Sequence, residues 1–281
     1  MPFGERPSSV RSADMATRKG DQVGPNSAIR GAVGATPAEN VDEVISRLTR
    51  IIEAATSSRS RLGYFASLYR SMTVAVQAGI ESGRFDDSQL MESLDVIFAN
   101  RYFSALRAYV AGEETPRSWH LAFEAASSSR PAIVQHLLLG VNAHIGYDLG
   151  LAAAATVPLD KLITLRPDFE EINRVIATVH EEVQRRIDAV SPFLHLIDLV
   201  GARTEDAIIE FSMDVSREAA WGAACTAALS HADPSFTAEL DGRTARLGQL
   251  ILNPGRVTSV ALRLIRLAER RSVPAVITAL S

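Results

Sequence analysis

The stretch QHLLLGVNAHIGYDL, residues 135–149, decides the fold. Residues 137–141 form a continuous apolar run, which predicts a buried helix. The same stretch carries four residues at successive spacings of four, namely His136, Gly140, His144 and Asp148. Because each step of four drifts by only about 40° around a helix, all four share one stripe. The sequence therefore predicts a central helix with polar groups on a buried face, and with room beside Gly140 for a substrate or a neighbouring backbone.

A helical pattern extends over nearly all of the chain from Asn40 onward. Apolar residues recur at spacings of three and four between residues 41 and 52. Turn and cap signals predict further helices over residues 61–82, 89–110, 116–127, 204–229, 243–252 and 254–270. No run alternates between apolar and polar residues, so no strand is predicted. We expect an all-α fold, a single-domain multi-helix bundle over residues 39–281.

Specific residues mark where these helices begin and end. Asn40 is expected to cap the first helix, with Glu43 as its capping-box partner. Gly83 and Gly112 end the next two. A long apolar stripe over residues 169–187 predicts one continuous helix, and Pro167 is expected to lie in the break before it.

The first 38 residues and the overall composition limit the class of protein. Residues 1–38 are rich in Gly, Pro, Ser and mixed charge, which is typical of a disordered leader. The 281 residues are 47% apolar and 22% charged, with a net charge of −4, so a dedicated nucleic-acid binder is not expected. Cys225 is the single cysteine, which excludes an intrachain disulfide.

No targeting or membrane-spanning segment is apparent. The leader has no apolar run long enough for a signal peptide. The apolar stretch over residues 149–158 is about ten residues long, against roughly 20 needed to cross a bilayer. We expect a cytoplasmic protein without a membrane span.

His144 and Asp148 carry the chemistry that the sequence suggests. One turn apart, they can hold one divalent metal ion such as zinc, iron or manganese, or act as an acid–base pair. The structural alternative is an ordinary buried hydrogen-bonded pair. His136 would be a second acid–base group or a third ligand.

Three residues elsewhere are expected to complete the site. Asp95 and Asp198 are the further metal-ligand candidates, because each carboxylate lies close to an apolar stripe. Arg217, one turn from Trp221, suggests a cation–π pair or a group that recognises an anion on the substrate. No phosphate-binding or dinucleotide-binding glycine loop occurs, so no nucleotide cofactor is expected.

The central stretch also resembles the signature of an uncharacterised bacterial all-helical family, a domain of unknown function. Residues 139–149 are similar to its pattern L-G-x-N-A-H-I-x-x-D-L. Further marks match in residues 95–99 with Tyr102, Trp119 with Phe123, Ser191 with Pro192, and Arg217 with Trp221. The resemblance implies a domain from about residue 40 to 275 and no particular reaction.

A more distant analogy is to helical zinc-dependent phospholipase C-like proteins, which hold metals with His and Asp on buried helices. The pair His144 and Asp148 is similar to one such ligand pair. This chain has few histidines and no secretion signal, so the analogy implies a mononuclear or dinuclear site at most.

Together these observations favour an enzyme acting on a small apolar molecule at a buried His/Asp site. The reaction expected is metal-dependent hydrolysis or a tailoring step of the cyclase or lyase type. The alternative is a non-catalytic helical protein that binds a hydrophobic ligand or a protein partner.

Overall fold

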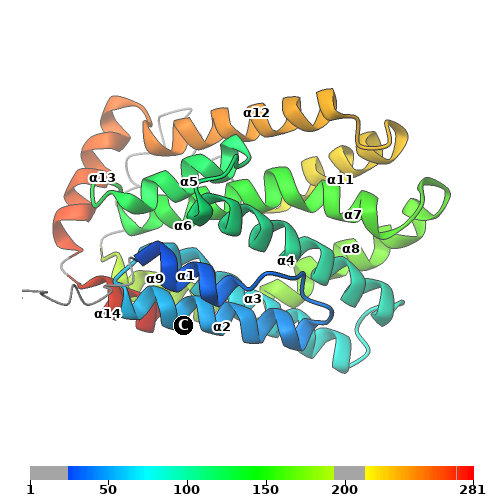
Figure 1. The fold of residues 1–281 in the computed structure, drawn as a ribbon, viewed down its shortest axis with the longest axis horizontal. Coiled ribbons are helices and arrows are strands. Elements are labelled where there is room, and N and C mark those ends of the chain that lie inside the picture. The colour runs from blue at the N-terminus through cyan, green and yellow to red at the C-terminus, as the bar shows by residue number, and fades with distance from the viewer. Residues whose placement is uncertain (1–24, 193–212, 270) are drawn as a thin grey trace, which may run out of the picture.

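A computed structural model describes residues 25–192, 213–269 and 271–281, and all regular secondary structure in these ranges is helical (Figure 1). The predicted all-α class is confirmed there. The first half consists of α1 (Pro25–Val33), α2 (Val41–Ser57), α3 (Leu62–Glu81), α4 (Ser88–Ala111), α5 (Arg117–Ser127), α6 (Ile133–Ala143), the π-helical turn η1 (His144–Leu149) and α7 (Gly150–Thr156). The second half consists of the short 3₁₀ turn η2 (Leu159–Lys161), α8 (Leu162–Ala177), α9 (His180–Val190), α11 (Met213–Leu229), α12 (Pro234–Leu252), α13 (Arg256–Ala268) and α14 (Val273–Leu280).

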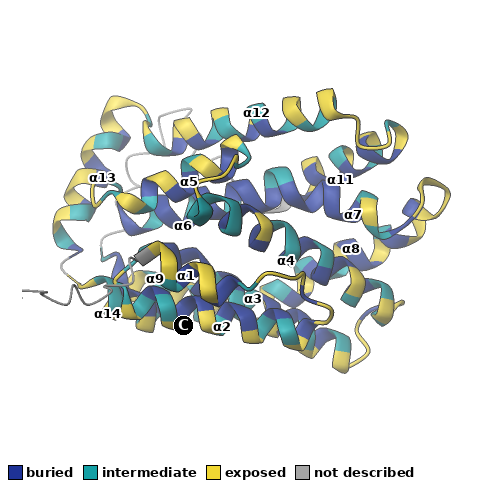
Figure 2. Ribbon diagram, viewed as in Figure 1, coloured by how far each residue is buried: buried dark blue, intermediate teal, exposed yellow. Residues whose placement is uncertain are grey.

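The central element is one continuous helix formed by α6, η1 and α7. It contacts α3, α4, α5, α11 and α12, so other helices surround it on several sides. In Figure 1, α12 runs along one side of this helix, while α2 and α3 lie on the other. Figure 2 shows the buried residues on the faces that the helices turn toward one another. The predicted buried helix over residues 135–149 is therefore the core of the fold.

This central helix, over Ile133–Thr156, is also long and apolar enough to cross a membrane. It is the one helix of the described part that meets this criterion, and 72% of its most apolar window is buried inside the fold. Burial of that extent is what a core helix shows, since its apolar side chains are covered by protein.

The predicted caps at Asn40 and Gly112 form, and α4 has a further cap at its start. The Asn40 side chain accepts a hydrogen bond from the Glu43 backbone N–H at 2.9 Å, whereas the Glu43 carboxylate accepts from the Glu39 backbone at 3.0 Å and so does not complete the expected box with Asn40. Asp87 caps α4 by accepting from the Leu90 N–H at 2.9 Å. Gly112 follows α4 with φ of 74°, a left-handed conformation that favours glycine.

The expected leader boundary at residue 38 is wrong, because residues 25–33 form a helix that belongs to the fold. Ile29 and Val33 of α1 are fully buried, and α1 packs on α2 and α4. Ala38 is tied to Asn100 by two hydrogen bonds of 2.7 and 2.9 Å. Nine residues carry too few apolar positions to stand out from a Gly- and Ser-rich surrounding sequence. Residues 1–24 lie outside the described residues.

Several predicted helix boundaries also differ. The stripe over residues 169–187 is divided between α8 and α9, which are separated at Thr178 and Val179. Pro167 lies inside α8 rather than before it, between the buried Leu165 and Phe169. The helix expected from residue 243 begins at Pro234, where the Asp233 side chain caps it. The part of the predicted 204–229 helix before residue 213 lies outside the described residues.

We expect Ile29→Ala to lower the free energy of unfolding by about 2–4 kcal/mol, because it leaves a cavity under α1. Arg30→Ala, on the exposed side of the same helix, is the matched control and should change it by no more than about 0.5 kcal/mol. Urea unfolding followed by circular dichroism measures both. Equal, negligible losses for the two variants would show that α1 does not pack as described.

Candidate functional site

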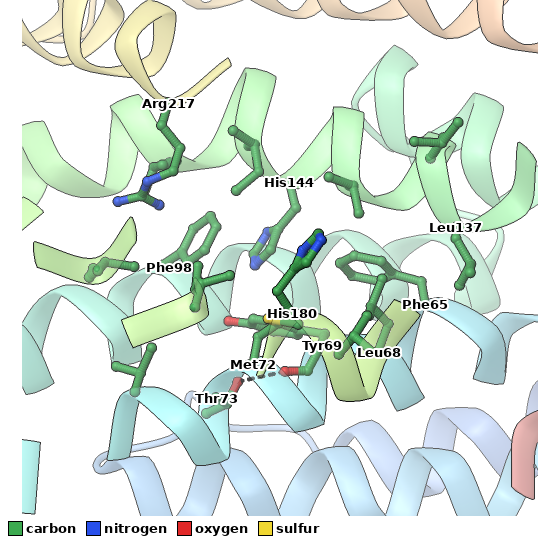
Figure 3. A pocket seen from close by; sticks show the side chains of 18 of the residues that line it. Phe65, Leu68, Tyr69, Met72, Thr73, Phe98, Leu137, His144, His180 and Arg217 are labelled. Carbon is green, nitrogen blue, oxygen red and sulfur yellow. Dashed lines mark hydrogen bonds between the residues drawn. The ribbon is translucent and has the colours of Figure 1, made fainter. Parts of the chain in front are cut away.

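A cavity of about 470 Å³ lies beside the central helix. Its lining comes from α3, α4, α6, η1, α8 and α9, with Arg217 of α11 at one side (Figure 3). Most of the lining is apolar and includes Met72, Leu137, Leu138, Val141, Ile172 and Ile176. Its volume falls within the range of small-molecule pockets, which is roughly 300–1,000 Å³.

His144 stands in the wall of this cavity, held from behind by Asp148. The His144 Nδ1 and Asp148 Oδ2 atoms are 3.1 Å apart, and both side chains are buried. The two residues belong to the π-helical turn, whose i→i+5 bonding places more residues in each turn than an α-helix does. Residue 148 therefore lies almost in line with residue 144. Turns of this kind occur frequently at functional sites.

The imidazole of His144 is enclosed by aromatic rings. Phe98 stacks on it with ring centroids 3.5 Å apart and an angle of 7°, and Tyr69 meets it edge-on at 4.5 Å. Phe65 and Trp119 contact it from further sides, at 5.7 and 5.8 Å. These rings fix the orientation of the imidazole.

Asp148 accepts three hydrogen bonds from three different elements. Trp119 Nε1 of α5 donates to Oδ2 at 2.8 Å, and Arg101 Nε of α4 donates to Oδ1 at 3.1 Å. The His144 Nδ1–H is the third donor. A buried carboxylate is stable only when it is satisfied in this way. Asp148 thus fixes the ring orientation of His144 and does not itself line the cavity.

The surroundings of His144 determine its protonation. Burial lowers the pKa of the imidazole, and the hydrogen bond to Asp148 offsets only part of that effect. The ring is therefore neutral near pH 7. Since Nδ1 donates to Asp148, the lone pair is on Nε2, an atom that is buried and has no hydrogen-bond partner in the described part of the chain.

Asp95 supplies a second polar group to the cavity lining. It is buried on α4, and its Oδ2 atom has no hydrogen-bond partner among the described residues. Burial raises the pKa of this carboxyl to about 7, and the neighbouring charge of Glu92 adds to the rise. Asp95 thus changes protonation near neutral pH.

Arg217 reaches the cavity, but it does not pair with Trp221 as expected. Its guanidinium lies over the Phe169 ring at 4.6 Å, and Nη2 donates to the Phe169 carbonyl at 2.7 Å. Arg166 is the cation that lies over Trp221, at 5.0 Å. His180 also lines the cavity, from an exposed position on α9. Figure 3 shows both side chains with His144 around the same space.

His136 does not reach this cavity, although it shares the predicted stripe. It is buried in a separate pocket of about 20 Å³, where Tyr64 meets it edge-on at 5.8 Å. The ring of Phe65 fills the space beside Gly140, so close that a Cβ atom there would lie 2.4 Å from it. The room predicted at Gly140 is therefore occupied by the protein itself. Burial lowers the pKa of His136 to about 3.

The predicted metal-ligand set does not assemble among the described residues. No three His, Cys, Asp or Glu side chains converge there. Asp95 shares the cavity lining with His144, whereas Asp198 lies outside the described residues. A metal ion at this site therefore stays a prediction.

The residues that hold the His144–Asp148 pair were not predicted from the sequence. Trp119 and Phe98 were matched only as family marks, and Arg101 received no role. One signal was available: a carboxylate on a buried helix needs donors, and the indole N–H of a buried tryptophan is such a donor. Asn142, in contrast, donates to the Thr244 carbonyl of α12 at 2.9 Å and fixes that helix against the centre.

The fold and this site define an all-helical protein with an apolar cavity next to a buried His–Asp pair. Residues 41–254 match DUF5995, a family of unknown function, and the chain belongs to this family. The match starts where the resemblance predicted and ends before the expected residue 275. No curated protein and no solved structure matches the chain.

We expect Gly140→Ala to destabilise the protein by about 1–3 kcal/mol, because the added methyl group overlaps the Phe65 ring. Gly222→Ala is the matched control, since Gly222 lies in α11 with no neighbour within 4 Å. That change should stabilise the protein by roughly 0.5–1 kcal/mol through helix propensity. Thermal unfolding of both variants measures the difference, and equal effects would contradict the close packing of α3 on α6.

Asp95→Asn should stabilise the protein at alkaline pH. Because the carboxyl binds its proton more tightly in the folded state, its contribution is present at low pH and is lost as the pH rises through about 7. The variant and the wild type should be similar near pH 4, and the variant should be more stable by up to about 4 kcal/mol near pH 8. Urea unfolding across this pH range measures the difference, and one that stays constant with pH would show that Asp95 ionises normally.

Proposed function

We propose that this protein binds an apolar small molecule in the cavity beside His144. The observation that carries the proposal is the cavity itself, which measures about 470 Å³, lies against the buried central helix and reaches the exposed His180 and Gln184 of α9. Apolar walls with a few polar groups are typical of ligand sites.

The arrangement of the polar groups supports an apolar ligand. Asp148 is already satisfied by Trp119, Arg101 and His144, so it offers little to a ligand. The unpartnered atoms His144 Nε2 and Asp95 Oδ2 are both covered by neighbouring side chains. A ligand therefore meets mainly hydrocarbon, with His180 and Arg217 at the cavity for any polar end.

Proton transfer by His144 is the second candidate function. It is favoured by the combination of a carboxylate on Nδ1 and a free lone pair on Nε2, the arrangement by which histidine acts as a general base. Because Nε2 is buried, a neighbouring side chain would have to move to uncover it. Metal-dependent hydrolysis is less favoured, since a cation at Asp148 would displace at least one of its three N–H donors.

Binding of the neutral fluorescent dye N-phenyl-1-naphthylamine tests the proposal. The fluorescence of the dye should increase as it binds to the wild type, and binding should be saturable and stoichiometric. Leu138→Trp, which fills the cavity from α6, should weaken binding at least about tenfold, equivalent to 1.4 kcal/mol. Leu250→Trp adds the same ring at an exposed position on α12 and should bind like the wild type.

Absence of dye binding, or equal binding by the two tryptophan variants, would contradict a ligand site in this cavity. Mass spectrometry of compounds extracted from purified wild type and His144→Gln separates the two functions. The same apolar compound in both preparations supports binding alone. A compound retained by His144→Gln and converted by the wild type supports proton transfer.

A further inference from the structure

Helix α13 carries a stripe of apolar side chains on its exposed face. Its members are Val257, Val260, Leu264 and Leu267, which are 55, 55, 55 and 72% exposed. They recur at spacings of three and four, so they lie together along one side of the helix. The opposite side holds Thr258, Leu262 and Ile265, which are buried in the fold. The exposed stripe is therefore separate from the face that anchors α13.

Positive charge accompanies this stripe. Arg256 and Arg263 are exposed, and on a helical wheel they lie within about 40° of Leu267. Residues 242–281 contain a single acidic residue, Glu269, which is buried. The same residues include four further described arginines, Arg243, Arg246, Arg266 and Arg271. This end of the chain is thus basic, although the whole protein carries a net charge of −4.

We infer that α13 docks this protein on an anionic lipid surface, with the apolar stripe entering the interface and the arginines contacting the headgroups. An amphipathic helix with aliphatic side chains beside basic residues is the arrangement that binds such surfaces. Arginine suits the boundary, since its stem is apolar and its guanidinium stays with the phosphates. Figure 2 shows α13 at one end of the molecule with exposed residues along it.

Other occupants fit the same surface less well. A second copy packed antiparallel on the stripe would bring the Arg256 and Arg263 edges of both chains close together, and like charges repel. A protein partner would be anchored best by aromatic side chains, but residues 242–281 contain none. The inference does not depend on what binds in the cavity.

Flotation of the full-length protein with lipid vesicles tests the inference. We expect binding to phosphatidylglycerol-containing vesicles, little binding to pure phosphatidylcholine, and release at high salt. The double variants Leu264→Gln/Leu267→Gln and Arg256→Gln/Arg263→Gln should each reduce binding at least about tenfold. All four positions are exposed, so circular dichroism should show an intact fold.

The matched control is Ile163→Gln/Leu229→Gln, which removes two apolar side chains that are 72 and 67% exposed on α8 and α11. Its vesicle binding should equal that of the wild type. No binding to anionic vesicles, equal binding to neutral ones, or equal loss in the control would overturn the inference. Dimerisation abolished by the stripe variant, without vesicle binding, would assign the surface to a second copy instead.

Discussion

The hydrogen bonding of the buried Asp148 carboxylate is the constraint on which the rest of the structure depends. A charge inside a helical core is tolerated only where donors surround it, and here they come from Arg101 of α4, Trp119 of α5 and His144 of the central helix. Removing one donor would leave the buried charge incompletely hydrogen-bonded, which is costly. The three hydrogen bonds therefore hold α4, α5 and the central helix in one arrangement. The position of the imidazole in the cavity wall follows from it.

Buried carboxylates organise the fold in three other places by capping helices from a distance. Asp168 of α8 accepts from the Asp86 and Asp87 N–H groups before α4, and Asp241 of α12 accepts from the first two N–H groups of α5. Glu269 accepts from the Ile133 N–H at the start of α6. Each carboxylate accepts hydrogen bonds from N–H groups that have no partner within their helix. Its negative charge also interacts favourably with the positive end of the helix dipole. The helices that build the site are thereby positioned by residues up to 136 positions away.

Sequence periodicity predicted the helical class, the buried central helix and the His144–Asp148 pair, because these depend on spacing within one element. What it missed depends on contacts between elements. Arg101 and Trp119 are 47 and 29 residues from Asp148, so no local pattern connects them. The helical stripe also predicted that His136 belongs to the site. His136 does lie on the stripe, but the Phe65 ring against Gly140 separates it from His144. Residues on one stripe share a face without sharing a cavity.

The separation of polar and apolar groups around the cavity has a functional consequence. Asp148 and the donors Arg101 and Trp119 lie behind the wall, so the lining stays mostly apolar, with Asp95, His144, His180 and Arg217 among its ionisable groups. A ligand that uncovered the buried Nε2 atom would reach a base, and one that did not would only be held. Under the proposed function, binding and proton transfer would therefore differ in whether the ligand uncovers this atom.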